Sequence, residues 1–136
     1  MVRFFDITTE TVPVGVSTWT VPETGEDFSD MHGAISTGPQ GNRRVLFLAH
    51  FNAGIRALDV RDPFHPTEIA YYTPAITAKT DKRCVGTGTD QHCKVAIQTN
   101  NVDVDDRGYI YGVDRANTGM VILELSGEAR SVANLP

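Results

Sequence analysis

Three histidines, His32, His50 and His92, are the side chains of this chain best suited to hold a metal ion. Neutral imidazole nitrogens bind zinc and copper, and carboxylate oxygens often complete such a site. We therefore take His32, with Asp103 as a second ligand, as a candidate metal site. The alternative is that the histidines lie at strand ends and only form hydrogen bonds. Further carboxylates that such a site would use are Asp30, Asp105 and Asp114.

The two cysteines, Cys84 and Cys93, lie nine positions apart in a stretch rich in glycine and threonine. This composition predicts an irregular loop, and we expect a disulfide bond to pin it. Such a bond indicates an oxidising compartment, so the protein would be secreted or periplasmic; with a reduced pair it would be cytoplasmic. Together with His92 the cysteines offer three metal ligands, but they lack the short Cys-x-x-Cys spacing that is typical of zinc sites.

An acidic run before Gly108, formed by Asp103, Asp105 and Asp106, is a second candidate cation site. Calcium loops carry carboxylates at this spacing, but they also need a distal glutamate, which is missing here. A polar strand face followed by a turn is the alternative.

Three charged residues, Arg56, Asp114 and Arg115, suit an anion clamp or an ion pair. A contact between neighbouring repeats is the alternative, because an exposed ion pair by itself stabilises a protein by only about 0–1 kcal/mol. No serine lies in a Gly-x-Ser-x-Gly elbow, and no glycine-rich stretch has the strand-to-helix context of a phosphate loop. The motifs therefore favour binding over nucleophilic catalysis.

The charge and hydropathy patterns argue against two classes of partner. The net charge is -5 and the twelve lysines and arginines are scattered, so we do not expect nucleic acid as a partner. No apolar run approaches the roughly 20 residues of a membrane helix, and the first residues lack the apolar stretch of a signal peptide. We expect a soluble chain with no membrane partner, forming one domain over residues 1–136.

An internal repeat organises the elements that would position these residues. An aspartate, a proline, an aromatic residue and a threonine recur in one register, 53 positions apart. The matched segments are Phe5–Ile7, Pro13 and Trp19–Thr20 in the first copy and Leu58–Val60, Pro66 and Tyr72–Thr73 in the second.

A second comparison extends the repeat towards the end of the chain. Val45–Leu48 and Gly54–Asp59 match Ile110–Val113 and Gly119–Glu124 at an offset of 65 positions. The longer offset is explained if the region Lys79–Lys94, which contains both cysteines, is an insertion between repeats.

The repeating segments are typical of β-strands. They are short, rich in β-branched and aromatic residues, and bounded by turn residues, and we find no amphipathic helix among them. Asp6 and Asp59 precede equivalent turns, where a carboxylate accepts backbone N–H groups, so we expect them to be structural. The predicted strands are 31–35, 44–50, 54–60, 67–72, 101–105, 108–113 and 119–125.

Four strands per repeat at a period of about fifty residues predict an all-β fold made of β-propeller blades, each a four-stranded antiparallel sheet. We expect a partial blade at 2–21, a full blade at about 30–75, the inserted cysteine loop at 79–94 and a last blade at about 95–126. Because propellers need about four to eight blades, one chain gives an incomplete ring. The ring would be closed by oligomerisation, or the chain would belong to a larger propeller; we favour a homo-oligomer.

The segment Gly54–Pro66 resembles the LVIVD-repeat family of predicted β-propellers. Repeats of that family pair a strand of the form glycine, aliphatic, x, aliphatic, aliphatic, Asp with a Pro-x-x-Pro turn. Phe4–Ile7 with Pro13 and the strand at Gly119–Leu123 are similar, although the first copy has one proline and the last has glutamate in place of aspartate. The resemblance implies the propeller fold and leaves activity open.

In a propeller the ends of the inner strands converge on a central channel. His32 and its counterpart Asn100 or Asn101 would then face the channel together, and we assign His50, Arg56 and the Asp114–Arg115 pair to the same binding surface. Our leading hypothesis is a non-enzymatic scaffold that binds a protein partner or a small ligand at the channel mouth and the cysteine loop. The rival hypothesis is a metal-dependent hydrolase or oxidoreductase with its metal on the channel axis near His32; no cofactor is identified.

Overall fold

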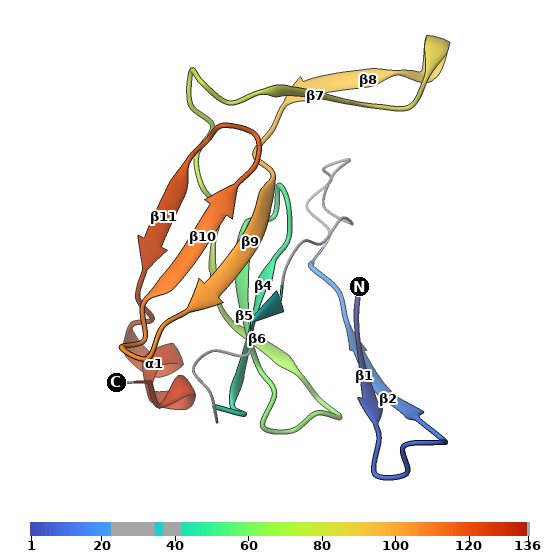
Figure 1. Cartoon of the computed structure of the whole chain (residues 1–136), viewed down its shortest axis with the longest axis vertical. Coiled ribbons are helices and arrows are strands. Elements are labelled where there is room, and N and C mark those ends of the chain that lie inside the picture. Colours follow the sequence, from blue (N-terminus) through green and yellow to red (C-terminus); the bar gives the residue numbers. More distant parts are fainter. Residues whose placement is uncertain (23–34, 37–41, 136) are drawn as a thin grey trace.

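The computed structural model describes residues 1–22, 35–36 and 42–135. Within these residues the strands form four antiparallel sheets, and none of the four closes on itself. Figure 1 shows three of the sheets side by side, while the fourth, a hairpin, projects beyond them. The described part of the chain is therefore mostly β, as the sequence predicted.

The first hairpin consists of β1 (Val2–Asp6) and β2 (Val14–Trp19). At its turn, the carboxylate of Asp6 accepts hydrogen bonds from the backbone N–H (2.8 Å) and the hydroxyl (2.6 Å) of Thr8. Asp59 accepts the same kind of backbone hydrogen bond, at 3.0 Å, from the residue two positions further on. Both aspartates thus hold turns, which is the structural role predicted for them.

The central sheet has four strands in the order β3 (Ile35–Ser36), β4 (Val45–Ala49), β5 (Ile55–Asp59) and β6 (Thr67–Tyr72). Each strand therefore pairs with its neighbour in the sequence. The last three strands match the predicted ones to within one residue at each end. The predicted strand 31–35 lies mostly outside the described residues.

The end sheet has three strands in the order β11 (Met120–Leu123), β10 (Ile110–Asp114) and β9 (Thr99–Val104). Its strands match the predicted ones to within two residues at each end. From Asn101 to Val104 the side chains of β9 alternate between exposed and buried, with Val102 and Val104 buried, as expected for a strand with one covered face.

The 53-residue repeat reappears in the backbone pairing. Val2 pairs with Trp19 as Ile55 pairs with Tyr72, so the first hairpin and the hairpin β5–β6 share one register. Both also have a register irregularity directly after the third residue of their first strand. Because such a bulge is a specific local feature, its recurrence shows that the two hairpins are structural copies.

The strand pairing follows the 65-residue repeat less closely than it follows the 53-residue repeat. In the central sheet Val45 lies opposite Asp59, which would place Ile110 opposite Glu124 in the end sheet. The structure instead pairs Ile110 with Leu123. The hairpin β10–β11 is therefore a copy of β4–β5 whose register has moved by one residue.

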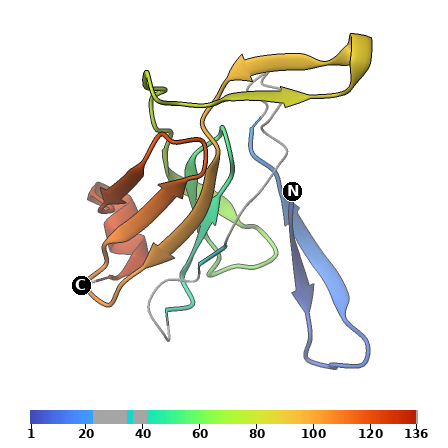
Figure 2. The same ribbon diagram turned by 45° about the horizontal axis from the view of Figure 1, so that its top comes forward.

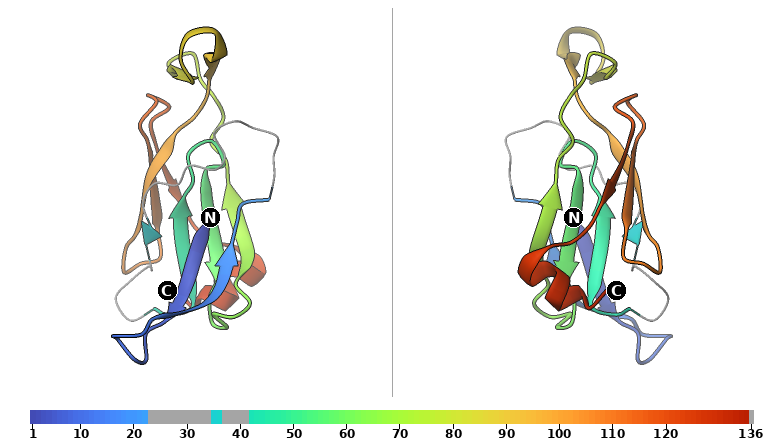
Figure 3. Two further views of the ribbon diagram at one scale, coloured as in Figure 1. Left: turned by 90° about the vertical axis from the view of Figure 1, so that its right-hand side faces the viewer. Right: turned by 90° about the vertical axis from the view of Figure 1, so that its left-hand side faces the viewer.

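The central sheet is covered on both faces, because it lies between the first hairpin and the end sheet (Figure 3). Towards the first hairpin, Leu48 and Leu58 pack with Val2, Phe4 and Trp19. Towards the end sheet, its side chains form one larger cluster with those of the end sheet and of the C-terminal helix. The buried members of that cluster are Val45, Phe47, Ala49, Ile55, Ala57, Val102, Val104, Ile110, Leu125, Ala129 and Ala133.

Gly112 on β10 allows the end sheet to approach the central sheet closely. A Cβ atom at this position would lie 2.2 Å from Cδ1 of Ile55, well inside van der Waals contact. A glycine within a strand is typical of such close approach. The two sheets therefore pack with Ile55 directly over the backbone of β10.

The helix α1 (Gly127–Ala133) corrects the expectation that the chain contains no helix. It buries Ala129 and Ala133, which lie one turn apart, in the larger core cluster. Side chains of Asn42 and Arg44 donate hydrogen bonds to the carbonyls of its last two residues, at 3.1 and 2.6 Å. In the described part of the chain, no helix has the length and apolarity needed to cross a membrane.

Candidate functional site

The two cysteines lie on the disulfide hairpin, formed by β7 (Lys82–Val85) and β8 (His92–Val95). Cys84 lies opposite Cys93 in the strand pairing, and the two are joined by a disulfide bond, as predicted. The expectation of an irregular loop is wrong, because the segment forms an antiparallel ladder with a short 3-10 turn at its tip. Figure 2 shows this hairpin extending away from the three packed sheets.

The base of the disulfide hairpin is fixed to the turn between β10 and β11. The backbone N–H of Asp81 donates to the carbonyl of Ala116 at 2.8 Å, and the guanidinium of Arg83 donates to the carbonyl of Arg115 at 3.1 Å. The side-chain amide of Asn117 also donates to the carboxylate of Asp81, at 3.0 Å. The hairpin therefore projects freely at its tip but is anchored at its base.

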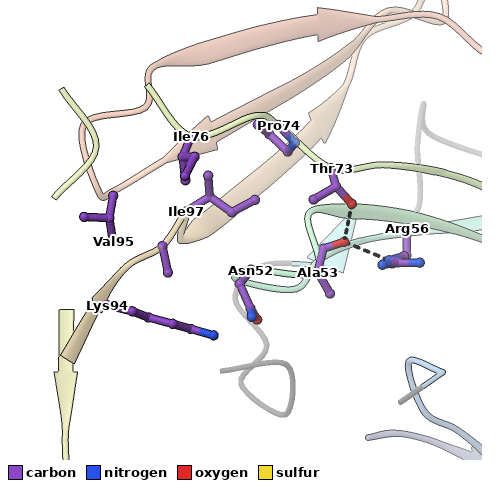
Figure 4. A pocket seen from close by; sticks show the side chains of 10 residues that line it. Asn52, Ala53, Arg56, Thr73, Pro74, Ile76, Lys94, Val95 and Ile97 are labelled. Carbon is purple, nitrogen blue, oxygen red and sulfur yellow. Dashed lines mark hydrogen bonds between the residues drawn. The ribbon is translucent and has the colours of Figure 1, made fainter. Parts of the chain in front are cut away.

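A cavity of about 590 Å³ lies beside this base (Figure 4). It is bounded by four segments: the turn between β4 and β5, the start of β5, the chain that leaves β6, and the end of β8 with the chain that follows it. Its volume falls within the usual range of small-molecule sites, about 300–1,000 Å³. The lining residues are Asn52, Ala53, Arg56, Thr73, Pro74, Ile76, Lys94, Val95, Ala96 and Ile97.

Arg56 forms a fixed cationic wall of the cavity. Its side chain is nearly buried, and Nε donates to the carbonyl of Ala53 at 2.8 Å. One guanidinium nitrogen forms an ion pair with Glu68 at 3.2 Å, and the guanidinium carbon lies 4.8 Å from the ring centre of Tyr71. These contacts hold the planar group in one orientation, as a preorganised binding site requires.

The opposite wall combines a second cation with aliphatic side chains. In Figure 4 the side chain of Lys94 extends along the cavity towards Asn52. Ile76 and Val95 are exposed at the mouth of the cavity. The cavity thus combines cationic and amide groups with apolar surface, which suits a ligand that carries both an anionic group and an apolar body.

Asp114 holds a turn at the start of the β10–β11 connection, away from the cavity. Its buried carboxylate accepts hydrogen bonds from the backbone N–H groups of Gln98, Ala116 (2.6 Å) and Thr118 (3.3 Å). The described contacts of Asp114 are thus with backbone donors, while Arg56 forms its ion pair with Glu68.

Arg115 joins the end sheet to the turn that follows β4. Its Nε donates to the side-chain carbonyl of Gln98 at 2.8 Å, and its guanidinium carbon lies 5.1 Å from the ring centre of Phe51. This geometry supports the alternative reading of Arg115 as a contact between repeats. Of the three charged residues predicted to act together, only Arg56 lines the cavity.

The candidate metal ligands do not converge in the described residues. His50 is buried with its ring 6.4 Å from that of Trp19, whereas His92 is exposed on the disulfide hairpin. Asp103 is exposed on β9, where it accepts a hydrogen bond from the N–H of Val104. No group of three histidine, cysteine or acidic side chains is placed to hold a metal among these residues. The positions predicted at His32 and Asp30 lie outside the described residues.

The acidic run before Gly108 forms a turn held by its own hydrogen bonds. Asp105 accepts hydrogen bonds from the N–H groups of Arg107 and Tyr109, from the guanidinium of Arg107 and from the hydroxyl of Tyr111. Burial raises the pKa of the Asp105 carboxyl, but these hydrogen bonds outweigh it and leave the pKa below its usual value. The geometry matches the alternative of a strand followed by a turn.

Asn101, the predicted counterpart of His32, lies exposed on β9 and accepts a hydrogen bond from the side chain of Asn100 at 2.7 Å. It does not line the cavity. Sequence reasoning missed most of the lining, including Asn52, Thr73 and Lys94. The signal that was present is that Lys94 lies within the predicted insertion, directly after Cys93.

Comparisons of the chain with protein-family models, with curated proteins and with solved structures found no match.

Proposed function

We propose that this chain is a non-enzymatic binding module built from propeller-type units, with its ligand site in the cavity beside the disulfide hairpin. The observation that carries the proposal is the cavity itself, a space of about 590 Å³ that combines Arg56 and Lys94 with aliphatic side chains. Its ligand is a small molecule or a partner segment with an anionic group and an apolar body.

The repeat supports the propeller-type interpretation. The central sheet has four antiparallel strands in sequence order, which is the arrangement of a propeller blade. The first hairpin copies the last two strands of that sheet, with the same register and the same bulge. We further propose that these units belong to the LVIVD type, whose strand pattern begins with Gly54 and ends with the turn-holding Asp59.

The lining of the cavity favours binding over catalysis. Among the residues that the structure describes, those that line it include no histidine, cysteine, serine or acidic side chain. The carboxylate of Glu68 is engaged in the ion pair that fixes Arg56. Histidine and carboxylates are the commonest general acids and bases, and serine and cysteine are common nucleophiles. Lys94 and Thr73 are the described lining residues whose types can also act in catalysis, and the hydroxyl of Thr73 donates to the carbonyl of Ala53 at 3.4 Å. The described lining therefore favours holding a ligand over transforming it.

The proposal is tested by titrating the isotope-labelled protein with octanoate, an anionic amphiphile, and following the backbone amide signals by NMR. We expect saturable shifts that are confined to the lining residues. Lys94→Gln should weaken binding by about 1.4- to five-fold, because an ion pair at a partly exposed site contributes about 0.2–1 kcal/mol.

Lys82→Gln is the matched control. Lys82 lies on the same hairpin, opposite Val95, but it does not line the cavity, so its replacement should leave the affinity unchanged. Shifts without saturation, or an equal loss of affinity in both variants, would contradict a ligand site in the cavity.

A further inference from the structure

Exposed apolar side chains gather at the two ends of the stack of sheets. At one end they lie on the first hairpin, where Phe5 and Ile7 line a surface hollow of about 490 Å³ together with Val16 and with Phe64 from the turn between β5 and β6. At the other end Val113, Met120 and Ile122 lie exposed on the end sheet. Figure 1 shows these two regions on opposite sides of the central sheet.

The repeat identifies what the first hairpin lacks. At the 53-residue offset Phe5 corresponds to Leu58, and Ile7 corresponds to Val60. Leu58 is 0% exposed and Val60 is partly buried, both in the cluster between the central sheet and the first hairpin, whereas Phe5 is 53% and Ile7 is 64% exposed. The outer face of the first hairpin therefore corresponds to the face of the central sheet that the first hairpin covers.

The end sheet lacks the complementary neighbour. At the 65-residue offset Met120 corresponds to Ile55, and Ile122 corresponds to Ala57. Ile55 and Ala57 are each 3% exposed beneath the end sheet, whereas Met120 is 60% and Ile122 is 56% exposed. The outer face of the end sheet thus corresponds to the face of the central sheet that the end sheet covers.

The interface between the first hairpin and the central sheet shows how two such faces meet. Val2 and Phe4 of the first hairpin are the counterparts of Ile55 and Ala57, and they pack in one cluster with Leu58. The exposed face of the end sheet, with Met120 and Ile122, corresponds to the face of the first hairpin that carries Val2. The exposed face of the first hairpin, with Phe5 and Ile7, corresponds to the face of the central sheet that carries Leu58. The two ends of the chain are therefore complementary to each other rather than to themselves.

We propose that a second copy of this chain binds head to tail, with its first hairpin packed on the end sheet of the first copy. Phe5 and Ile7 of one copy would cover Met120 and Ile122 of the other. The exposed charges are opposite in sign and so complementary, because Arg3 lies on the first hairpin beside Phe5 and Asp103 lies on the outer face of the end sheet. Such a contact is heterologous, so it closes into a ring or continues as a chain of copies. It does not involve the ligand cavity.

The test uses the full chain and measures its mass in solution over a range of concentrations by sedimentation velocity. The wild-type mass should rise with concentration to a multiple of the monomer mass. Phe5→Asp and Ile122→Asp, which each place a charge on one of the two faces, should remain monomeric. Circular dichroism should show unchanged strand content, because both side chains are exposed.

Mixing the two variants distinguishes head-to-tail binding from pairing of like faces. Phe5→Asp retains an intact end sheet and Ile122→Asp retains an intact first hairpin, so the mixture should give a complex of two copies and nothing larger. Ile76→Asp is the control, because Ile76 is 61% exposed but lies on neither face, and it should associate like the wild type.

A wild-type chain that stays monomeric at every concentration would overturn the proposal. So would association of either charged variant with itself, since that requires two like faces to pair. A mixture of the two variants that stays monomeric would also contradict it.

Discussion

The first hairpin and the hairpin β5–β6 have the same backbone design in different surroundings. Their strand pairs share one register and one bulge position. Leu58 is nevertheless fully buried, whereas its counterpart Phe5 is about half exposed. The comparison teaches that the local sequence specifies the hairpin, and that burial depends on whether another sheet lies alongside.

The largest expected effect separates these two positions. Leu58→Ala should lower the free energy of unfolding by about 2–5 kcal/mol, because it leaves a cavity in a packed core. Phe5→Ala should change it by about 0.5 kcal/mol or less at low protein concentration, as is usual for an exposed site. Chemical denaturation followed by circular dichroism measures both. Equal losses in the two variants would show that the outer face of the first hairpin is buried within a single copy.

The strands were predictable because their signals are local. Thr67–Tyr72, for example, is a short segment with β-branched and aromatic residues that follows the turn at Pro66, and it was predicted with its observed bounds. The aspartate that ends each first strand also gave a correct prediction of turns at Asp6 and Asp59. Each of these features depends only on residues within one hairpin.

The helix α1 was missed because much of its support comes from outside the segment. Its last carbonyls accept hydrogen bonds from Asn42 and Arg44, which lie about ninety positions earlier in the chain. At seven residues it is also too short to show a hydrophobic period. The available signals were Ser126 before it and Asn134 after it, residue types that favour the two ends of a helix.

The cavity was mostly unpredictable for a similar reason. Its lining comes from four segments that meet only after the sheets have packed, and Arg56 alone was among the predicted binding residues. Arg56 was grouped with Asp114 and Arg115 as an anion clamp or an ion pair, but the ion pair that it forms in the structure is with Glu68, one strand away. Sequence reasoning found the charged residue and missed the partner that orients it.

The second comparison concerns two glycines that open equivalent strands. Gly54 and Gly119 both have positive φ, +75° and +113°. A Cβ atom at Gly54 would lie 2.2 Å from the backbone oxygen of Tyr72, whereas nothing lies within 4 Å at Gly119. Gly54→Ala should therefore destabilise the protein by about 3 kcal/mol and Gly119→Ala by about 1 kcal/mol.

Thermal unfolding of the two glycine variants under identical conditions measures the difference. If Gly119→Ala lowers the stability as much as Gly54→Ala, backbone strain rather than the contact with Tyr72 governs both positions. The two glycine positions would then have the same effect on stability, although only Gly54 lies close to another part of the backbone.

The smallest expected effect compares Asp59 with Asp6 in acid. A hydrogen bond from the Arg61 side chain is the main cause that lowers the pKa of Asp59, and hydrogen bonds from Thr8 lower the pKa of Asp6. Since each folded-state pKa lies below its unfolded value, the stabilisation is present at neutral pH. It is lost as the pH falls below about 4, through the folded-state pKa.

Asp59→Asn should therefore flatten the acid side of the stability profile, and Asp6→Asn should flatten it less, because Asp6 has no cationic partner among its described hydrogen bonds. Urea unfolding between pH 2 and 7 measures both profiles, using that span because it brackets the carboxyl pKa of about 3.9. Arg61→Ala should reproduce the effect of Asp59→Asn, since it removes the same ion pair. If both aspartate variants flatten the profile equally, the Thr8 hydroxyl stabilises the Asp6 carboxylate as effectively as the guanidinium of Arg61 stabilises that of Asp59. The two turns would then be equivalent in energy as well as in geometry.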